Sequence, residues 1–136
     1  MAPLHLASAR VATKGQLRLL DRVRAICMAL PEVSERLSHG EVTWFIREKR
    51  TLAMMDDHHH GADHFAVTVP APPGVQQDLI ARDPERFYRP AYVGPSGWVG
   101  VRLDAGVDWD ELEVLIEDAY RLKAPKTLVR QLDDEP

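Results

Sequence analysis

The chain has 136 residues, of which 45% are hydrophobic and 28% are charged, and this balance is typical of one globular domain. The formal net charge of −4 argues against a dedicated nucleic-acid-binding protein, and a single cysteine, Cys27, excludes an intramolecular disulfide. No apolar run approaches the roughly 20 residues of a membrane-spanning helix, and the opening segment has no strong secretory signal. We therefore expect a protein of the reducing cytoplasm that has no membrane partner.

The charge is distributed unevenly along the chain. Residues 1–50 contain nine Lys or Arg and five Asp or Glu, whereas residues 104–136 contain four and ten. This asymmetry is typical of a protein with an oriented charged surface, and it is equally typical of two solvated helix faces of opposite sign.

The first expected element is an amphipathic helix over residues 14–30. Thr13 can cap its start, and Pro31 ends it because a residue before proline avoids the helical conformation. Apolar residues recur at spacings of three and four and predict a buried stripe of Leu20, Val23, Cys27 and Leu30.

Period-two patterns follow this helix. Residues 33–40 are expected to form a polar connection, and residues 42–47 to form a strand with one apolar side. A charged turn and a strand over residues 51–55 complete a hairpin. After a polar loop over residues 56–62, a third strand covers residues 63–69.

Prolines and glycines divide the middle of the chain. They predict a short helix over residues 74–82, a brief turn over 85–88 and an irregular loop over 90–97. A strand over residues 98–103 comes next, with Val99 and Val101 on its apolar side.

The last helix has the clearest start signal. Asp108 can cap it, and Glu111 stands three residues later in the capping-box position. The helix ends before Pro125, and residues 126–132 are expected to add one short turn. Its buried stripe comprises Leu112, Leu115, Ile116 and Ala119.

This order of elements predicts an α+β fold. We expect a single domain over residues 14–132, with an antiparallel sheet, helices packed on one face, and the N-terminal and C-terminal helices flanking the strands. Residues 1–13 and 133–136 are expected to be flexible. The expected core comprises Leu20, Val23, Cys27, Ile46, Val99, Val101, Leu112, Leu115 and Ile116.

Several stretches together resemble the MmcQ/YjbR family of small bacterial proteins. They are Ala71-Pro-Pro-Gly74, Asp83-Pro-Glu-Arg-Phe87, Tyr92-Val-Gly-Pro-Ser-Gly-Trp98 with the following Val99-Gly-Val-Arg-Leu-Asp104, Asp110-Glu-Leu112 and Ala124-Pro-Lys126. Their order and spacing match the family from about Arg22 to Lys126.

The resemblance implies a compact α+β fold similar to that of bacterial frataxins. It also implies DNA binding, because the family is commonly described so from the likeness of its sheet to a double-wing module; this is an analogy of fold. It supplies no catalytic motif. The frataxin likeness suggests iron, but the first helix offers little more than Asp21 as an acidic ligand, so iron handling is not supported.

Four histidines and three carboxylates lie within residues 56–64. Imidazole and carboxylate groups are suitable ligands for zinc, nickel or iron. However, consecutive residues of an extended loop point in different directions and do not converge on one ion. The histidines are therefore weak metal candidates, we expect no cofactor, and we expect residues 58–60 to be exposed and metal-free. The candidates are His58, His59, His60 and His64.

Nucleophilic catalysis has little support. Cys27 lies on the apolar stripe of the first helix, where a buried thiol is inert. No serine has the context of a nucleophile elbow, and no glycine-rich phosphate loop precedes a helix. An enzyme of unknown reaction stays an alternative.

The period-two split of the strands predicts a binding face opposite the apolar side. Exposed aromatic rings among arginines could stack on bases or hold an anionic ligand. Alternatively, the first helix or the loop over residues 90–97 covers these aromatic rings and makes them ordinary core. The face comprises Phe45, Arg47, Lys49, His64, Trp98 and Arg102.

We therefore expect a monomeric, non-enzymatic binding protein whose ligand, as the resemblance implies, is DNA. The alternative is a protein that binds or modifies a small anionic molecule. Salt separates the two, because each phosphate neutralised on duplex DNA adds a slope of about −0.9 to the logarithm of the binding constant. In the DNA model, the carboxylates of the last helix lie on the side away from the arginines.

Overall fold

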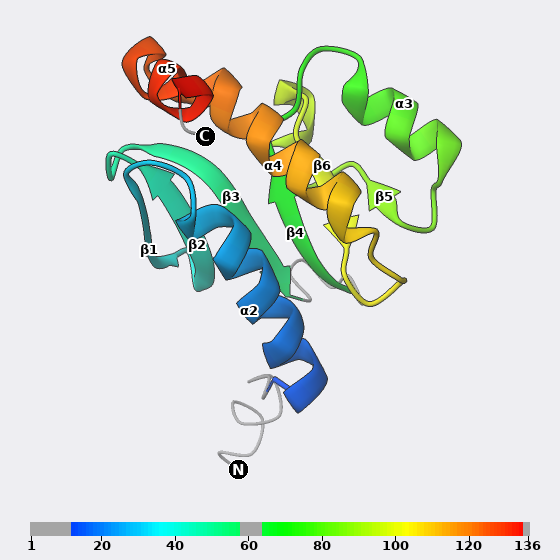
Figure 1. Ribbon diagram of the computed structural model, residues 1–136. Helices are drawn as coiled ribbons and strands as arrows, with labels where there is room; N and C mark the ends of the chain where they lie inside the picture. Colours follow the sequence, from blue (N-terminus) through cyan, green and yellow to red (C-terminus); the bar gives the residue numbers. More distant parts are fainter. Residues whose placement is uncertain (1–11, 58–63, 135–136) are drawn as a thin grey trace.

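A computed structural model describes residues 12–57 and 64–134 (Figure 1). Six strands form one sheet in the order β1-β2-β3-β4-β6-β5, and every neighbouring pair is antiparallel. The strands are β1 (Val33–Ser38), β2 (Glu41–Ile46), β3 (Arg50–Asp57), β4 (Phe65–Val69), β5 (Phe87–Tyr88) and β6 (Val99–Arg102). The helices are α2 (Lys14–Met28), α3 (Val75–Arg82), α4 (Trp109–Lys123) and α5 (Lys126–Asp134), with a short 3₁₀ turn η2 (Gly94–Ser96).

Helices α2 and α4 lie across one face of the sheet, and α3 lies beside β5 at one edge (Figure 1). The expected α+β fold with an antiparallel sheet is confirmed. In the part of the chain that the structure describes, no helix is long and apolar enough to cross a membrane.

The core lies between the sheet and the two long helices. Trp44 and Ile46 of β2 and Val67 of β4 face this side, because they alternate with residues that face the other way. All the expected core residues are buried except Leu20, which is half-buried and packs against the core. Burial raises the pKa of the Cys27 thiol well above its ordinary value, consistent with an inert side chain.

Both long helices have the expected N-caps. Thr13 Oγ1 accepts a hydrogen bond from the Gln16 backbone N–H (3.0 Å), and Gln16 Oε1 accepts one from the Thr13 N–H (3.0 Å), which completes a capping box. Asp108 accepts a hydrogen bond from the Glu111 N–H (3.1 Å). The Glu111 carboxylate does not accept a hydrogen bond from the Asp108 backbone N–H, because it pairs with Arg82 (2.6 Å) and Arg86 (3.3 Å) instead.

Four segments differ from the expectation. Residues 56 and 57, expected in a polar loop, belong to β3, which continues through Asp57. Residues 33–38, expected as a connection, form the edge strand β1, whose pattern is obscured because polar residues occupy both of its faces. The brief turn over 85–88 contains the short strand β5. The single turn over 126–132 is the nine-residue helix α5, which continues through Asp134 and buries Leu128.

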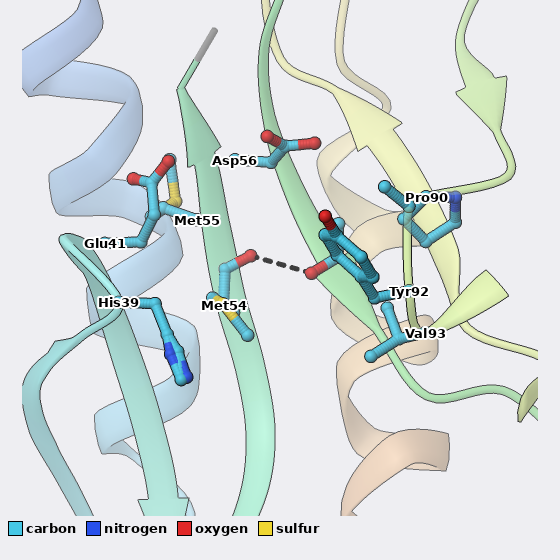
Figure 2. A pocket seen from close by; sticks show the side chains of 10 residues that line it. His39, Glu41, Met54, Met55, Asp56, Pro90, Tyr92 and Val93 are labelled. Atoms are coloured by element: carbon cyan, nitrogen blue, oxygen red, sulfur yellow. Dashed lines mark hydrogen bonds between the residues drawn. The ribbon is translucent and has the colours of Figure 1, made fainter. Parts of the chain in front are cut away.

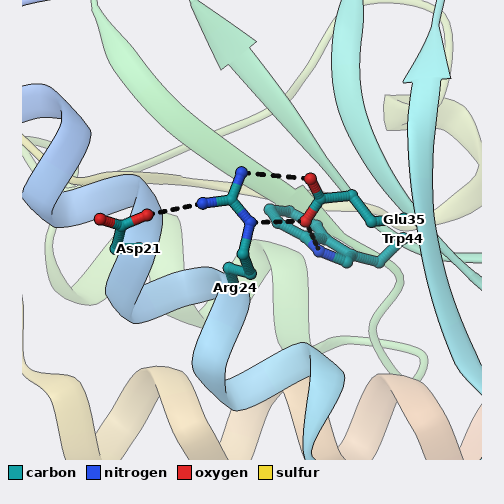
Figure 3. A network of polar contacts seen from close by, with 4 residues as sticks. All are labelled: Asp21, Arg24, Glu35 and Trp44. Carbon is teal, nitrogen blue, oxygen red and sulfur yellow. Dashed lines mark hydrogen bonds and ion pairs between the residues drawn. The ribbon is translucent and has the colours of Figure 1, made fainter.

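A polar network joins α2 to the first hairpin (Figure 3). Arg24 donates to Asp21 (2.6 Å) and to both oxygens of Glu35 (2.7 and 3.1 Å). The Trp44 indole N–H also donates to Glu35 (2.9 Å). The hydrogen bonds from Arg24 lower the pKa of the Glu35 carboxyl; burial opposes this shift, and the hydrogen bond from Trp44 adds a smaller lowering, so the net shift is downward.

Glu35→Gln is expected to destabilise the protein at neutral pH and to do so less in acid. Because the folded-state pKa of Glu35 is lowered, its ionised form stabilises the fold fully above about pH 4.3, the ordinary value, and loses this effect as the pH falls through the folded-state pKa. Urea denaturation of both proteins at about pH 7 and about pH 3 measures the difference. The exposed Glu113, which has no ion pair among the described residues, supplies the control Glu113→Gln. A difference for Glu35→Gln that is independent of pH would contradict this assignment.

Candidate functional site

The face of the sheet opposite α2 and α4, here called the outer face, carries small side chains along its centre. The strand register aligns Thr43, Met54, Thr68, Gly100 and Tyr88 in one row across five strands. A glycine and two threonines in this row fill little volume. The outer face is therefore hollow where the apolar face is densely packed.

Residues 90–98 are here called the roof segment, and their first four residues, 90–93, border this hollow. A cavity of about 570 Å³ separates the start of the roof segment from β2, β3 and β4 (Figure 2). This volume falls within the usual range of small-molecule sites, roughly 300–1,000 Å³. The cavity is lined by His39, Glu41, Met54, Met55, Asp56, Thr68, Pro90, Ala91, Tyr92 and Val93.

Two carboxylates stand at one end of the cavity (Figure 2). Glu41 is 7% exposed, and its Oε2 accepts a hydrogen bond from the Asp57 backbone N–H (2.7 Å). Asp56 Oδ2 accepts a hydrogen bond from the Tyr88 hydroxyl and lies 2.9 Å from His64 Nε2. Two neighbours on one oxygen hold the orientation of the Asp56 carboxylate. The Thr68 hydroxyl donates to the Met54 carbonyl (3.1 Å), so this donor is already used.

Tyr88 holds the Asp56 carboxylate through the hydrogen bond from its hydroxyl. Its ring lies directly on Gly100, where a Cβ atom would come within 2.2 Å of ring atoms Cε1 and Cζ. The His64 ring packs against it at a centroid distance of 4.4 Å. Burial raises the pKa of Tyr88 above its ordinary value, and the hydrogen bond to Asp56 raises it further, so the hydroxyl stays a donor.

Arg102 lies on the far side of Tyr88. Its guanidinium is 5.6 Å from the centre of the Tyr88 ring, and its Nη1 donates to the Glu85 carbonyl (3.4 Å). Its Nε is buried and has no hydrogen-bond partner among the described residues. Arg102 is therefore a neighbour of the Asp56 cluster rather than a free cation on the surface.

A model of the YjbR family matches residues 28–122, which is well over half of the chain. The chain belongs to the YjbR family. Every residue that lines the cavity falls within the matched range. The resemblance drawn from the sequence motifs is confirmed.

One solved structure with a YjbR-like fold is the crystal structure of Deinococcus radiodurans protein DR2400, which has a DUF419 domain. The two chains are 20% identical, the alignment covers 76% of each, and the TM-score is 0.64. At this identity the likeness shows the fold alone. No curated protein matches the chain.

In this YjbR-family chain, the binding face of exposed aromatic rings and arginines expected from the sequence is not formed. Phe45 is 6% exposed because the Arg36 guanidinium lies 3.6 Å above its ring. Arg47 pairs with Glu32 (3.1 Å), and Lys49 is exposed in the turn after β2. The aromatic ring is covered, as in the alternative interpretation, although Arg36 covers it rather than the first helix.

Trp98 immediately precedes β6 and Arg102 ends it, so the two residues lie at opposite ends of this strand. Trp98 is 7% exposed and borders a shallow hollow beside Arg50 and Lys123, at the end of α4. Arg102 lies four residues further along the same extended segment, which corresponds to about 13 Å, and it aligns through β4 with Asp56. Of the expected binding residues, His64 contacts the cavity-lining Asp56 through its side chain, whereas Trp98 contacts the cavity-lining Val93 through a backbone hydrogen bond (3.4 Å).

The metal expectation is tested only in part. His58, His59 and His60 lie outside the described residues. Within residues 12–57 and 64–134, no group of three or more His, Cys, Asp or Glu side chains could hold a metal ion. His64 is buried and engages Asp56 instead.

Sequence reasoning missed the residues that form the polar end of the cavity. The sequence predicts Asp56 in a polar loop, but β3 continues through Asp57 and places Asp56 on the outer face. Tyr88 was assigned to a turn, whereas it pairs with Gly100 in the sheet. The sequence does contain a signal for the longer strand, because Met54 and Asp56 continue its period-two alternation.

Proposed function

We propose that this protein binds a small molecule in the outer-face cavity, and that this ligand has an apolar body and a cationic head group. The observation that supports the proposal is a cavity of about 570 Å³ with a mainly apolar wall and two carboxylates at one end. A largely apolar concave site with a few polar groups is the usual form of a small-molecule site.

The apolar wall suits a hydrocarbon or aromatic body. Met54 lies on the sheet side, and Pro90 and Val93 lie on the roof side. A methionine side chain adapts its shape to different ligands because it is unbranched and flexible. Each apolar square ångström that the ligand removes from water contributes about 25 cal/mol before the costs of association.

The carboxylates of Glu41 and Asp56 favour a cationic head group. Within the described ranges, no lysine or arginine lines the cavity. Both carboxylates already accept hydrogen bonds, and an ammonium group on a ligand would add an opposite charge and further N–H donors. The anionic ligand expected from the sequence would instead face repulsion from these two groups.

DNA binding has less support than binding in the cavity. A phosphate contact needs accessible cations, but Arg47 is paired with Glu32, and Arg102 lies against Tyr88 at the opposite end of the sheet. Arg102 and the exposed carboxylates of α4 do lie on opposite faces, which DNA binding requires. DNA is therefore the competing proposal that the test must address.

Three phenyl compounds of similar size test the ligand class. We expect phenethylamine to bind and to shift the NMR signal of the Met54 methyl group, with weaker effects from phenethyl alcohol and none from phenylacetate. Met28 is 45% exposed on α2 and serves as the internal control. Equal shifts at Met28 and Met54, or stronger binding of phenylacetate, would contradict the proposal.

Two variants and a DNA titration complete the test. Met54→Trp should abolish binding because it fills the cavity, and Glu41→Gln should reduce the preference for the amine over the alcohol. Duplex DNA is titrated at two salt concentrations in the same buffer. Tight, strongly salt-dependent DNA binding that is unchanged in Met54→Trp would favour the competing proposal.

A further inference from the structure

Gln76 is a buried polar side chain that the cavity does not explain directly. It lies in the first turn of α3 and is 3% exposed. Its Nε2 donates to the Gly94 carbonyl (2.9 Å) and to the Trp98 carbonyl. One side-chain amide therefore connects α3 to two points of the roof segment.

The backbone hydrogen bonds within the roof segment are local. Gly94 N–H donates to the Pro90 carbonyl (3.0 Å), and Trp98 N–H donates to the Val93 carbonyl (3.4 Å). These bonds shape the turn but do not fix its position above the sheet. Gln76 comes from a different element, so its two hydrogen bonds tie the middle and the end of the roof segment to α3.

The roof segment also contains a residue in an uncommon conformation. Tyr92 has a φ of 63°, in the left-handed region, and its side chain is 84% exposed. A bulky residue keeps such a conformation only when the surrounding structure enforces it. The backbone around Tyr92 is therefore held by its surroundings, and the turn that Gln76 bonds begins two residues later.

We propose that Gln76 is the positioning residue of the cavity: it holds the roof segment at a set distance from β3 and so determines the width available to a ligand. This inference rests on the proposed function for the role of the cavity. Both acceptors are carbonyl oxygens, so the group between them must supply two N–H donors. A glutamine amide does so, whereas a glutamate carboxylate or a methionine does not.

The test compares the roof segment in Gln76→Glu and Gln76→Met, both of which nearly preserve volume. Hydrogen exchange of the backbone amides of residues 91–98 is measured relative to the parent at each pH, with the amides of β2 as the check of the global fold. We expect exchange in the roof segment to rise by about tenfold in both variants at about pH 8. Gln77 is the adjacent, exposed glutamine of α3, and Gln77→Glu and Gln77→Met should leave exchange unchanged.

The pH dependence separates positioning from general destabilisation. A protonated glutamate offers one O–H donor, so exchange in Gln76→Glu should approach that of the parent as the pH falls to about 5. Gln76→Met has no donor at any pH and should show no recovery. Unchanged exchange in both variants, or the same pH recovery in Gln76→Met, would overturn the inference.

Binding of phenethylamine then connects the roof segment to the cavity. Its Kd should rise by about tenfold in Gln76→Met and stay unchanged in Gln77→Met. A loosened roof segment with an unchanged Kd would overturn the role of Gln76 in setting the cavity width. If the parent protein does not bind the amine, the proposed function fails, and hydrogen exchange still decides whether Gln76 holds the roof segment.

Discussion

Replacement of Leu115 by alanine is expected to lower the free energy of unfolding by about 2–5 kcal/mol. Leu115 lies in α4 and is 7% exposed in the core between this helix and the sheet. The substitution removes buried methyl groups from contact and leaves a space that the neighbouring side chains fill only in part. Urea denaturation monitored by circular dichroism measures the loss.

The adjacent residue supplies the control for Leu115→Ala. Val114 is 58% exposed on the solvent side of the same helix, so Val114→Ala should change the free energy of unfolding by no more than about 0.5 kcal/mol. A loss below about 1 kcal/mol for Leu115→Ala, or equal losses for the two variants, would show that α4 presents a different face to the sheet.

Replacement of Gly100 by alanine is expected to cost about 1–3 kcal/mol by overpacking. The added Cβ would come within 2.2 Å of the Tyr88 ring. This ring cannot move away easily, because its hydroxyl bonds Asp56 and the His64 ring packs against it. We therefore expect Tyr88 to be displaced and the Asp56 carboxylate to lose its support, which should also weaken phenethylamine binding.

A double-mutant cycle tests the cause of the Gly100→Ala effect. In a Tyr88→Ala background the ring is absent, so Gly100→Ala should then cost less than about 0.5 kcal/mol. The coupling energy between the two sites reports the collision itself, independently of the strand propensity of alanine. An equal cost of Gly100→Ala in both backgrounds would contradict the packing of Tyr88 on Gly100.

The elements with a local period are the ones that sequence reasoning predicted. The helical spacing of Val23 and Cys27 in α2 and of Leu112 and Ile116 in α4 depends on neighbouring residues of the same segment, so it is visible without the fold. The edge strand β1 was missed for the converse reason. Its Glu35 is polar in sequence, and only the approach of Arg24 and Trp44 explains its place on the helix-facing side.

The candidate site has no comparable local signal. Asp56 and Tyr88 are separated by 32 residues in the chain and by β4 and β6 in the sheet, and they meet because the Tyr88 ring lies across Gly100 of β6. The split into two faces was visible in the strands, but the coverage of the outer face was not. Arg36 covers Phe45, and the roof segment covers the hollow above Thr68.

The sequence by itself thus determined α2, α3 and α4, most of the strands and part of the core, since burial follows from periods of 3.6 and 2 that each segment carries alone. Only the tertiary structure decided what the other face of the sheet becomes. Strand order, register and the attachment of residues 90–98 through Gln76 are contacts between distant segments. These contacts place small residues, which form no recognisable motif in the sequence, beside a cavity with Glu41 and Asp56 at one end.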